Sequence, residues 1–377
     1  MVLSAIAIGV LAVWAALTWI FRKSAGSKLI AYTSALAITL ALGMIAEGFG
    51  PSYAYLHITA VYLLSVAGVL GMFGAIEFGI LRLIGLFRLG AITRITYYEA
   101  LLQPFTIIVV VMGIAAITIL AFVPYYTMGE DYKMYRDVAI SMAFLFTLPI
   151  MVFASTKVID EEIENRTMLT LMSKPIARWQ VVIGKYFGVT VLCLGVIAAL
   201  GIIAGTCAYL RYFDDMRIDY FVSRTVQEND LLNLNNTKAV LAIIPSILLE
   251  FLQLAMLAAV SVAISTRWGL ALNVTATVIL YIGANISRYA VAMDLPAPLS
   301  WVVWLVAHLL PNLASMDLSQ RLVYGNFNYG NRFIAGGNTP SYGQIWQYVG
   351  IASAYAVFYV SGVLSCGVAM FRTRELT

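Results

Sequence analysis

The sequence predicts an all-α integral membrane protein, and three observations lead to this fold class. First, 62% of the 377 residues are hydrophobic and only 11% are charged. A soluble domain carries about 25% charged residues, so this chain could not cover a water-facing surface of its size. Second, apolar runs long enough to cross a bilayer recur along the whole chain. Third, most basic residues fall in loops on one side of the topology that these runs imply.

A spanning helix needs about 20 mostly apolar residues, and nine stretches of the chain meet this requirement. The predicted spans are 2–21, 29–46, 58–80, 102–123, 138–156, 182–209, 239–264, 269–290 and 345–370. The stretch 299–313 is apolar but short, and Pro311 closes it, so we expect a re-entrant or interfacial element there. The first run has no charge before it and the length of a span, which favours a transmembrane helix over a cleavable signal.

The basic residues set the expected orientation. Arg22 and Lys23 directly follow the first span, and cytoplasmic loops are enriched in Lys and Arg. We therefore expect the N-terminus outside and the C-terminus in the cytoplasm. The expected location is the cell membrane, with a bacterial inner membrane favoured. The net charge of +4 is spread along the chain without a basic block, which gives no support for nucleic-acid binding.

The chain divides near residue 86 into two regions. Residues 1–86 hold three predicted helices with short connections, and residues 87–377 hold the other six. The stretch 87–102 mixes apolar and charged residues just before a span, which favours an amphipathic helix lying in the inner interface. A plain cytoplasmic loop is the alternative.

The stretch 158–180, between the fifth and sixth predicted spans, combines charges with an apolar centre. Carboxylates lie where the fifth span would leave the bilayer, and they are followed by an Arg–Thr pair, leucines and a Lys–Pro pair. These residues are Asp160, Glu161, Glu162, Glu164, Arg166, Thr167, Leu169, Lys174, Pro175 and Arg178. Proline disfavours helical geometry in the residue before it but fits the first turn of a new helix. The pattern predicts a helix, a break and a second helix, suited to docking on a soluble partner. A solvated loop is the alternative.

This stretch resembles the signature of type-2 ABC exporter permeases, which runs E-x-E-x-[RK]-T, a leucine-rich turn, S-[KR]-P and a basic–aromatic pair. The matching residues are Glu162, Glu164, Arg166, Thr167, Leu169, Leu171, Ser173, Lys174, Pro175, Arg178 and Trp179. The segment from His308 to Leu318 resembles permeases of the multicopper-enzyme maturation and gliding-motility type. The resemblance covers residues 87–377. It implies a six-helix core with an elbow helix at 87–102 and a coupling helix at 158–180 that rests in a groove of the ATPase subunit.

The resemblance also implies the partners of the chain. The sequence has no G-x-x-x-x-G-K-[ST] for phosphate binding. Its Gly184-Lys185 pair has Trp179 in place of the first glycine and Tyr186 in place of the hydroxyl residue. We therefore expect ATP and magnesium on a separate ABC ATPase subunit, and a permease with no catalytic site, cofactor or metal of its own. We also expect a dimer with a second permease copy or a homologue.

Polar residues within the predicted spans are candidates for a translocation path, because an intramembrane charge is costly. Glu250, Gln253 and Asn273 form this candidate path, with a helix–helix contact as the alternative for Glu250. Asn273 and Asn285 could also hydrogen-bond a neighbouring helix. For Glu77 we expect neutralisation by an arginine that follows it at the inner interface.

Two other function classes stay open. An ion-coupled secondary transporter would use paired membrane carboxylates, for which Glu77 and Glu250 are available, although no internal repeat is visible. A non-transporting subunit of a larger redox complex would need haem-ligating histidines within spans, whereas His57 and His308 are expected near the outer face. The three cysteines lie in apolar runs without metal-ligand spacing, which favours small hydrophobes in helix or lipid contacts. The substrate cannot be read from the sequence.

Overall fold

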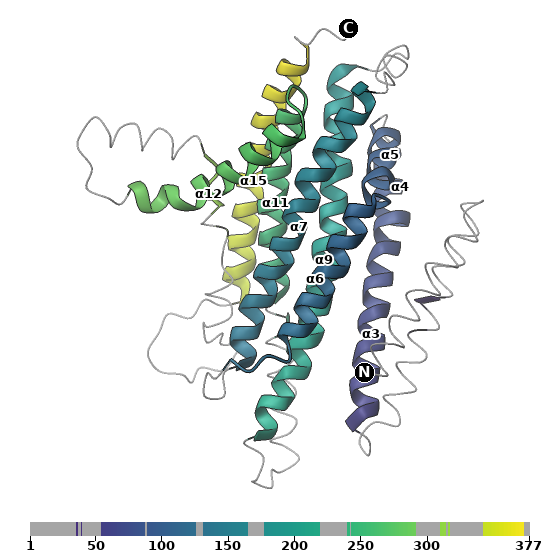
Figure 1. Ribbon diagram of the computed structural model, residues 1–377, viewed down its shortest axis with the longest axis vertical. Helices are drawn as coiled ribbons and strands as arrows, with labels where there is room; N and C mark the ends of the chain where they lie inside the picture. Colours follow the sequence, from purple (N-terminus) through teal and green to yellow (C-terminus); the bar gives the residue numbers. More distant parts are fainter. Residues whose placement is uncertain are drawn as a thin grey trace.

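The computed structural model describes residues 35, 36, 39, 54–86, 89–125, 131–164, 177–218, 240, 241, 243–291, 310–313, 316 and 342–372. Within them all regular secondary structure is helical, and the helices pack into an elongated bundle (Figure 1). The elements are α3 (Ala54–Ala75), the π-helical turn η2 (Ile76–Ile80), α4 (Leu81–Ile84), α5 (Gly90–Leu101), α6 (Pro104–Leu120), α7 (Asp131–Glu164), α9 (Arg178–Ile218), α11 (Ile243–Ser265), α12 (Leu270–Val291) and α15 (Tyr342–Arg372). The predicted all-α class holds across the described part of the chain.

Five helices are long and apolar enough to cross a membrane. Their candidate spans are Ala60–Ile84, Asp131–Lys157, Trp179–Tyr212, Ile243–Ser265 and Gly343–Phe371. The pair of α5 and α6 adds a sixth if the two helices are counted as one broken span. These six correspond to the third to seventh and the ninth of the predicted spans.

The prediction of nine spans is not confirmed. The first two, 2–21 and 29–46, lie outside the described residues apart from three positions. The eighth, 269–290, corresponds to α12, whose described apolar part Leu270–Ile286 is shorter than the five spanning helices. Of the predicted interfacial element only 310–313 is described.

Helices α7 and α9 extend beyond the spans that hydropathy predicts. α7 has 34 residues and α9 has 41. Apolar composition marks only the part of a helix inside the hydrocarbon, which is about 30 Å thick. A helix continues beyond that layer where good helix formers follow, as Glu161, Glu162 and Glu164 do at the end of α7. The carboxylate-rich residues therefore continue α7 without a break.

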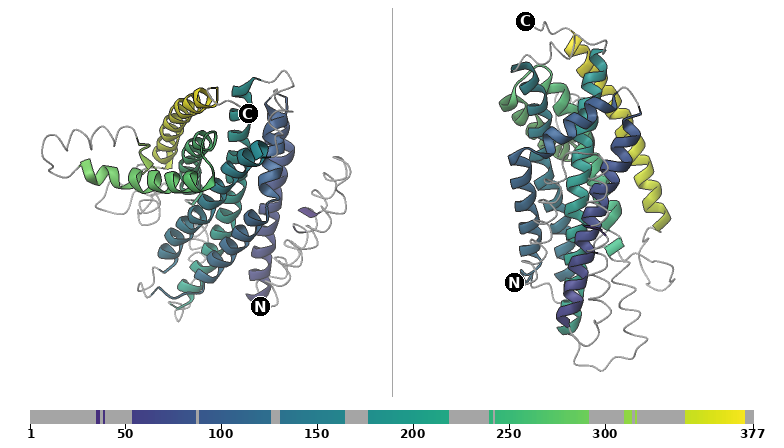
Figure 2. Two further views of the ribbon diagram at one scale, coloured as in Figure 1. Left: turned by 45° about the horizontal axis from the view of Figure 1, so that its top comes forward. Right: turned by 90° about the vertical axis from the view of Figure 1, so that its right-hand side faces the viewer.

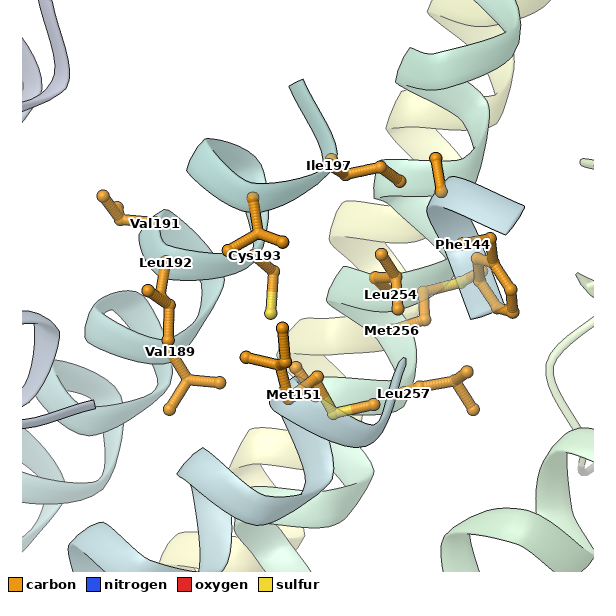
Figure 3. Close-up of a cluster of buried hydrophobic side chains, with 14 of the residues drawn as sticks. Phe144, Met151, Val189, Val191, Leu192, Cys193, Ile197, Leu254, Met256 and Leu257 are labelled. Atoms are coloured by element: carbon orange, nitrogen blue, oxygen red, sulfur yellow. The ribbon is translucent and has the colours of Figure 1, made fainter. Parts of the chain in front are cut away.

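Helix α9 lies at the centre of the bundle and contacts α3, α5, α6, α7, α11 and α15. Figure 3 shows side chains of α9 packing with those of α7 and α11. Phe144 of α7, Leu192 and Cys193 of α9, and Leu254 of α11 are all buried there. The thiols of Cys193 and Cys207 are free and buried, so both cysteines are small core hydrophobes, as the sequence predicts.

The two ends of the bundle differ in what they hold. One end, which we call the α5 end, holds α4 and α5, the start of α9 and the ends of α7 and α15 (Figure 1). The opposite end holds the start of α7 and the end of α9. α3 and α15 lie on the outside of the bundle (Figure 2), and α12 leaves it obliquely. The expected topology places the α5 end in the cytoplasm.

Candidate functional site

At the α5 end, α5 and α6 meet at an angle of 64°. Pro104 takes the first position of α6, where its missing N–H would have had no partner within the helix. α5 buries one face against the bundle, whereas Arg94 and Glu99 on the other face are exposed. A helix thus occupies Gly90–Leu101 within the stretch 87–102. Its place in the membrane interface stays a prediction.

Helix α5 packs closely against two glycines of α9, Gly184 and Gly188. A Cβ on Gly188 would lie 2.6 Å from the Cβ of Thr96 and 2.9 Å from the carbonyl oxygen of Thr93. A Cβ on Gly184 would lie 2.9 Å from the Cγ2 of Ile92. Small residues four positions apart let membrane helices approach closely. We call this α5–α9 contact the glycine notch.

Glu77 lies in the π-helical turn η2 and faces α5. The hydroxyl of Tyr98 donates a hydrogen bond of 2.6 Å to its Oε1. The guanidinium carbon of Arg94 lies 5.7 Å from the centroid of the Tyr98 ring. Single π-helical turns occur often at functional sites. Sequence reasoning expected an arginine partner for Glu77 and did not identify Tyr98, which comes from a different helix.

The predicted coupling residues border the connection between α7 and α9, at the α5 end. The backbone of Asp160, Glu161, Glu162 and Glu164 forms the last turns of α7, and Arg178 is the first residue of α9. The side chains of these five residues lie outside the described part of the structure, as do Arg166, Thr167, Leu169, Lys174 and Pro175 altogether. Their coupling role therefore stays a prediction.

A side-chain cap fixes the start of α9. The backbone N–H of Ala177 donates to the Oε1 of Gln180 at 3.2 Å, and the backbone N–H of Gln180 donates back to the Ala177 carbonyl at 2.9 Å. This reciprocal pair satisfies backbone groups that a helix start leaves open. The connection from α7 therefore enters α9 at a defined residue.

The candidate path residues Glu250 and Gln253 are buried within α11, with exposed fractions of 8% and 4%. Ser246 and Ser261 lie on the same face, since residues spaced by whole helical turns line up. The buried hydroxyl of Ser246 has no hydrogen-bond partner among the described residues. We call Ser246, Glu250, Gln253 and Ser261 the α11 seam. Sequence reasoning missed both serines, although their spacing from Glu250 was the available signal.

Asn273, at the start of α12, joins three helices. Its Nδ2 donates to the Oγ1 of Thr156 on α7 at 2.6 Å and to the Oγ of Ser261 on α11 at 2.8 Å. The hydroxyl of Thr277 donates to the Asn273 Oδ1 at 3.3 Å, and the hydroxyls of Ser155 and Ser261 hydrogen-bond each other. All five side chains are buried, and we call them the polar joint.

The interhelical bond predicted for Asn273 is thus present, whereas Asn285 donates to the carbonyl of Tyr281 within α12. The candidate path does not form a single cluster. Ser261, the partner of Asn273, lies 11 residues after Glu250 on α11, which is about 16 Å along the helix axis. The path residues therefore follow α11 toward the α5 end, and their role in translocation stays a prediction.

An ion pair ties α9 to the start of α7 at the opposite end. Arg211 Nη2 lies 3.1 Å from Asp131 Oδ2, and the two side chains are 11% and 16% exposed. Arg211 also donates to the Ala121 carbonyl, and the backbone N–H of Tyr125 donates to Asp131 Oδ2 at 3.1 Å. Burial raises the pKa of the Tyr125 phenol, which stays a neutral donor to the Leu120 carbonyl. We call this group the Arg211 clasp.

The short segment 310–313 docks against two helices. The backbone N–H of Asn312 donates to the hydroxyl of Tyr355 on α15 at 3.1 Å. Leu310 lies next to Gly283 of α12, and Leu313 is fully buried. The residues around Pro311, within the stretch from His308 to Leu318 that the sequence singled out, are therefore part of the helix packing.

Most of these features lie within the part of the chain that matches a known protein family. A family model described as "ABC-2 family transporter protein" matches residues 115–376, more than half of the chain. The match runs from within α6 past the end of α15, so it includes the α7–α9 connection, the α11 seam and the polar joint. The chain belongs to the ABC-2 transporter family. It is therefore a multi-pass membrane protein and the permease component of an ABC transporter, a class whose partner is an ABC ATPase. No curated protein matches the chain.

Part of this ABC-2 permease lies before the matched region. α3 and α5 precede residue 115, yet both pack directly on α9. The hydroxyls of Ser65 on α3 and Thr206 on α9 hydrogen-bond each other, and the Phe73 ring lies 3.3 Å from where a Cβ on Gly195 would stand. α3 and α5 are therefore packed into the same bundle as the ABC-2 core.

Proposed function

We propose that this chain is the membrane half of an ABC exporter, in which a separate ATPase drives a substrate across the membrane. The observation that supports this proposal is the ABC-2 match across the α7–α9 connection. There α7 carries Asp160, Glu161, Glu162 and Glu164 past the end of its span. Charges at a rim steer a partner and set its register, and apolar anchors such as Leu169 hold it.

In the proposed mechanism the coupling helix at 158–180 receives the movement of the ATPase. ATP binding closes the ATPase subunits and shifts the end of α7, because the coupling residues begin on that helix. The polar joint hydrogen-bonds α7 to α11 and α12, so the shift reaches the α11 seam. The permease then alternates between states with different access. ATP and magnesium stay on the partner, and this chain supplies binding and movement.

We further propose a dimer, because a six-span core supplies half of an exporter pore. In this arrangement the α5 end faces the cytoplasm, the N-terminus lies outside, and the location is a bacterial inner membrane. Basic residues support this orientation, since Arg82, Arg94, Lys157 and Arg267 all stand at the α5 end.

Co-purification tests the proposal. The tagged chain is purified in detergent from its native host and compared with the double variant Glu162→Lys/Glu164→Lys. The matched control is Asp214→Lys/Asp215→Lys, which reverses two acidic residues near the other end of α9. We expect an ATPase with a Walker A sequence to accompany the wild type and the control, and to be lost from the Glu162/Glu164 variant.

Two outcomes would contradict the proposal. If a well-folded wild type brings down no ATPase, the coupling proposal fails. If the control loses the ATPase as readily as the test variant, the contact is not specific to the end of α7. If no ATPase accompanies the wild type, Glu77 and Glu250 become the residues to test for ion coupling, which is the second candidate function. The test is a proton- and sodium-flux assay on Glu77→Gln and Glu250→Gln in vesicles.

A further inference from the structure

An apolar groove of about 950 Å³ runs between α9, α11 and α15. This volume is at the upper end of the range for small-molecule sites. Trp179, Phe187, Phe251, Val360 and Leu364 are among its lining residues, and α7 contributes none. The groove is therefore separate from the polar joint and from the end of α7 that carries the coupling residues.

The groove has the length of one lipid leaflet. Its wall on α15 extends from Ala356 to Ala369, which is about 20 Å along a helix. Half of the hydrocarbon core is about 15 Å thick. Trp179 stands at the α5 end of the groove with 39% of its surface exposed, and tryptophan is enriched where hydrocarbon meets headgroups. The groove thus extends from one membrane surface to near the bilayer centre.

The hydroxyl groups in the groove wall already have partners within the protein. Ser361 donates to the Phe358 carbonyl at 2.8 Å and Ser365 donates to the Ser361 carbonyl at 2.7 Å. The Tyr186 hydroxyl donates to the Ala255 carbonyl at 3.3 Å. Hydroxyls that bond a helix backbone leave no strong donor for a polar ligand. The wall therefore suits a hydrocarbon chain.

Each helix that walls the groove has an arginine at its α5 end or just beyond it. Arg178 is the first residue of α9 and Arg372 is the last residue of α15. Arg267 follows α11 and its side chain is exposed. A Cβ on Gly367 would lie 3.0 Å from the Ala263 Cβ, so Arg267 stands about one helical turn beyond that level. No acidic residue lines the groove.

We propose that this groove binds one acyl chain of an anionic phospholipid from the leaflet at the α5 end, with the phosphate at the arginine ends. The chain fills the apolar slot, and the exposed Arg267 side chain favours an anionic over a zwitterionic headgroup, as basic residues at a membrane surface do. This proposal does not depend on the exporter function, because it needs neither an ATPase nor a transported substrate.

Native mass spectrometry of the full chain tests the proposal. Detergent-purified protein is titrated with phosphatidylglycerol or with phosphatidylcholine of the same acyl chains. Ser365→Phe fills the groove, and Cys366→Phe adds the same ring at the next residue, which is exposed and does not line the groove. We expect bound phosphatidylglycerol on the wild type and Cys366→Phe, and its loss from Ser365→Phe. Equal retention by both variants overturns the proposal.

A second arm locates the lipid and tests the headgroup. Phosphatidylglycerol with a photoreactive diazirine in its acyl chain is expected to crosslink to residues of α9 and α15 that line the groove. Crosslinks confined to other helices, or a wild-type dimer that excludes lipid from the groove, overturn the proposal. Arg267→Gln is expected to keep the crosslinks but to reduce the preference for phosphatidylglycerol over phosphatidylcholine. An unchanged preference overturns the headgroup part of the proposal.

Discussion

Two groups of contacts, one near each end of the bundle, differ in kind. At the α5 end, the glycine notch relies on close backbone approach and the polar joint on neutral amide and hydroxyl groups. At the opposite end, the Arg211 clasp uses an ion pair with little exposure to solvent. The polar joint near the predicted coupling residues thus consists of neutral side chains, whereas the clasp at the opposite end contains an ion pair.

The difference lies in what happens when each contact opens. In the joint, the Thr156 hydroxyl also bonds the Val152 carbonyl of its own helix at 2.8 Å, so separation leaves it a partner. Opening the clasp would leave Asp131 and Arg211 as partly buried charges, and uncompensated charges are costly. We therefore expect the Arg211 clasp to resist opening more strongly than the polar joint does.

The largest effect is expected from breaking the glycine notch. Gly188→Ala places a Cβ against Thr96 and the Thr93 carbonyl, and overpacking of this kind costs about 3 kcal/mol of stability. The measurement is thermal unfolding in detergent, followed by size-exclusion chromatography. Gly350→Ala, with no atom near its added Cβ, is the control. Thr96→Gly should restore part of the loss, and equal stability of the two alanine variants would contradict the notch.

A smaller loss is expected from breaking the clasp. Arg211→Gln leaves Asp131 without its cation, and we expect a loss of about 2 kcal/mol, because the pair retains some contact with solvent. The exchange Arg211→Asp/Asp131→Arg should recover part of the loss in the same unfolding assay. If the single variant is as stable as the wild type, the opposite end is not fixed by this pair.

The polar joint is expected to contribute less. Asn273→Leu removes two donated hydrogen bonds, and interhelical hydrogen bonds in membranes contribute about 1 kcal/mol each or less. Thr275→Leu on the same helix, whose hydroxyl bonds its own backbone, serves as the control. Hydrogen exchange at the α5 end should rise in Asn273→Leu and stay unchanged in Thr275→Leu. A matched rise in both would show that the joint does not hold the three helices.

The smallest effect is expected at Glu77. Tyr98→Phe removes one hydrogen bond, with an expected loss of about 1 kcal/mol. Glu77→Gln keeps an acceptor for Tyr98 and should be milder. The two variants are compared by thermal unfolding, and a larger loss for Glu77→Gln would mean that the charge itself, not the hydrogen bond, holds α5.

Hydropathy predicts much of this fold because a bilayer enforces it. Six predicted spans correspond to described helices or to the bent pair, and the stretch before the fourth span forms α5. Hydropathy alone underestimates helix length, since α7 continues to Glu164, beyond the predicted span 138–156. The separate pattern of charges in 158–180 does predict a helix there. An apolar run marks the hydrocarbon layer, and the helix is longer than that layer.

Contacts between distant residues could not be predicted from a single sequence. Asp131 and Arg211 are separated by 80 positions, and nothing in either local pattern indicates the pairing. Asn273 was recognised as a polar residue in a span, but its partners Thr156 and Ser261 depend on how three helices pack. Gly188 lies in an apolar run where a glycine has several uses, and only the position of Thr96 shows which one applies.

Helix α7 connects three of these features on one rod of 34 residues: Asp131 in the clasp, Thr156 in the joint and Glu164 at its far end. A rod of this length spans about 50 Å, so a tilt of about 10° about Asp131 would carry Glu164 about 9 Å. In that lever, Thr156 travels about three quarters as far as Glu164. Pro149 lies inside the helix and removes a backbone hydrogen bond, which gives α7 a place to flex. If α7 bends at Pro149, Thr156 moves only about half as far as Glu164. The position of the proline therefore determines how much of a movement at Glu164 reaches the helices that contact Thr156.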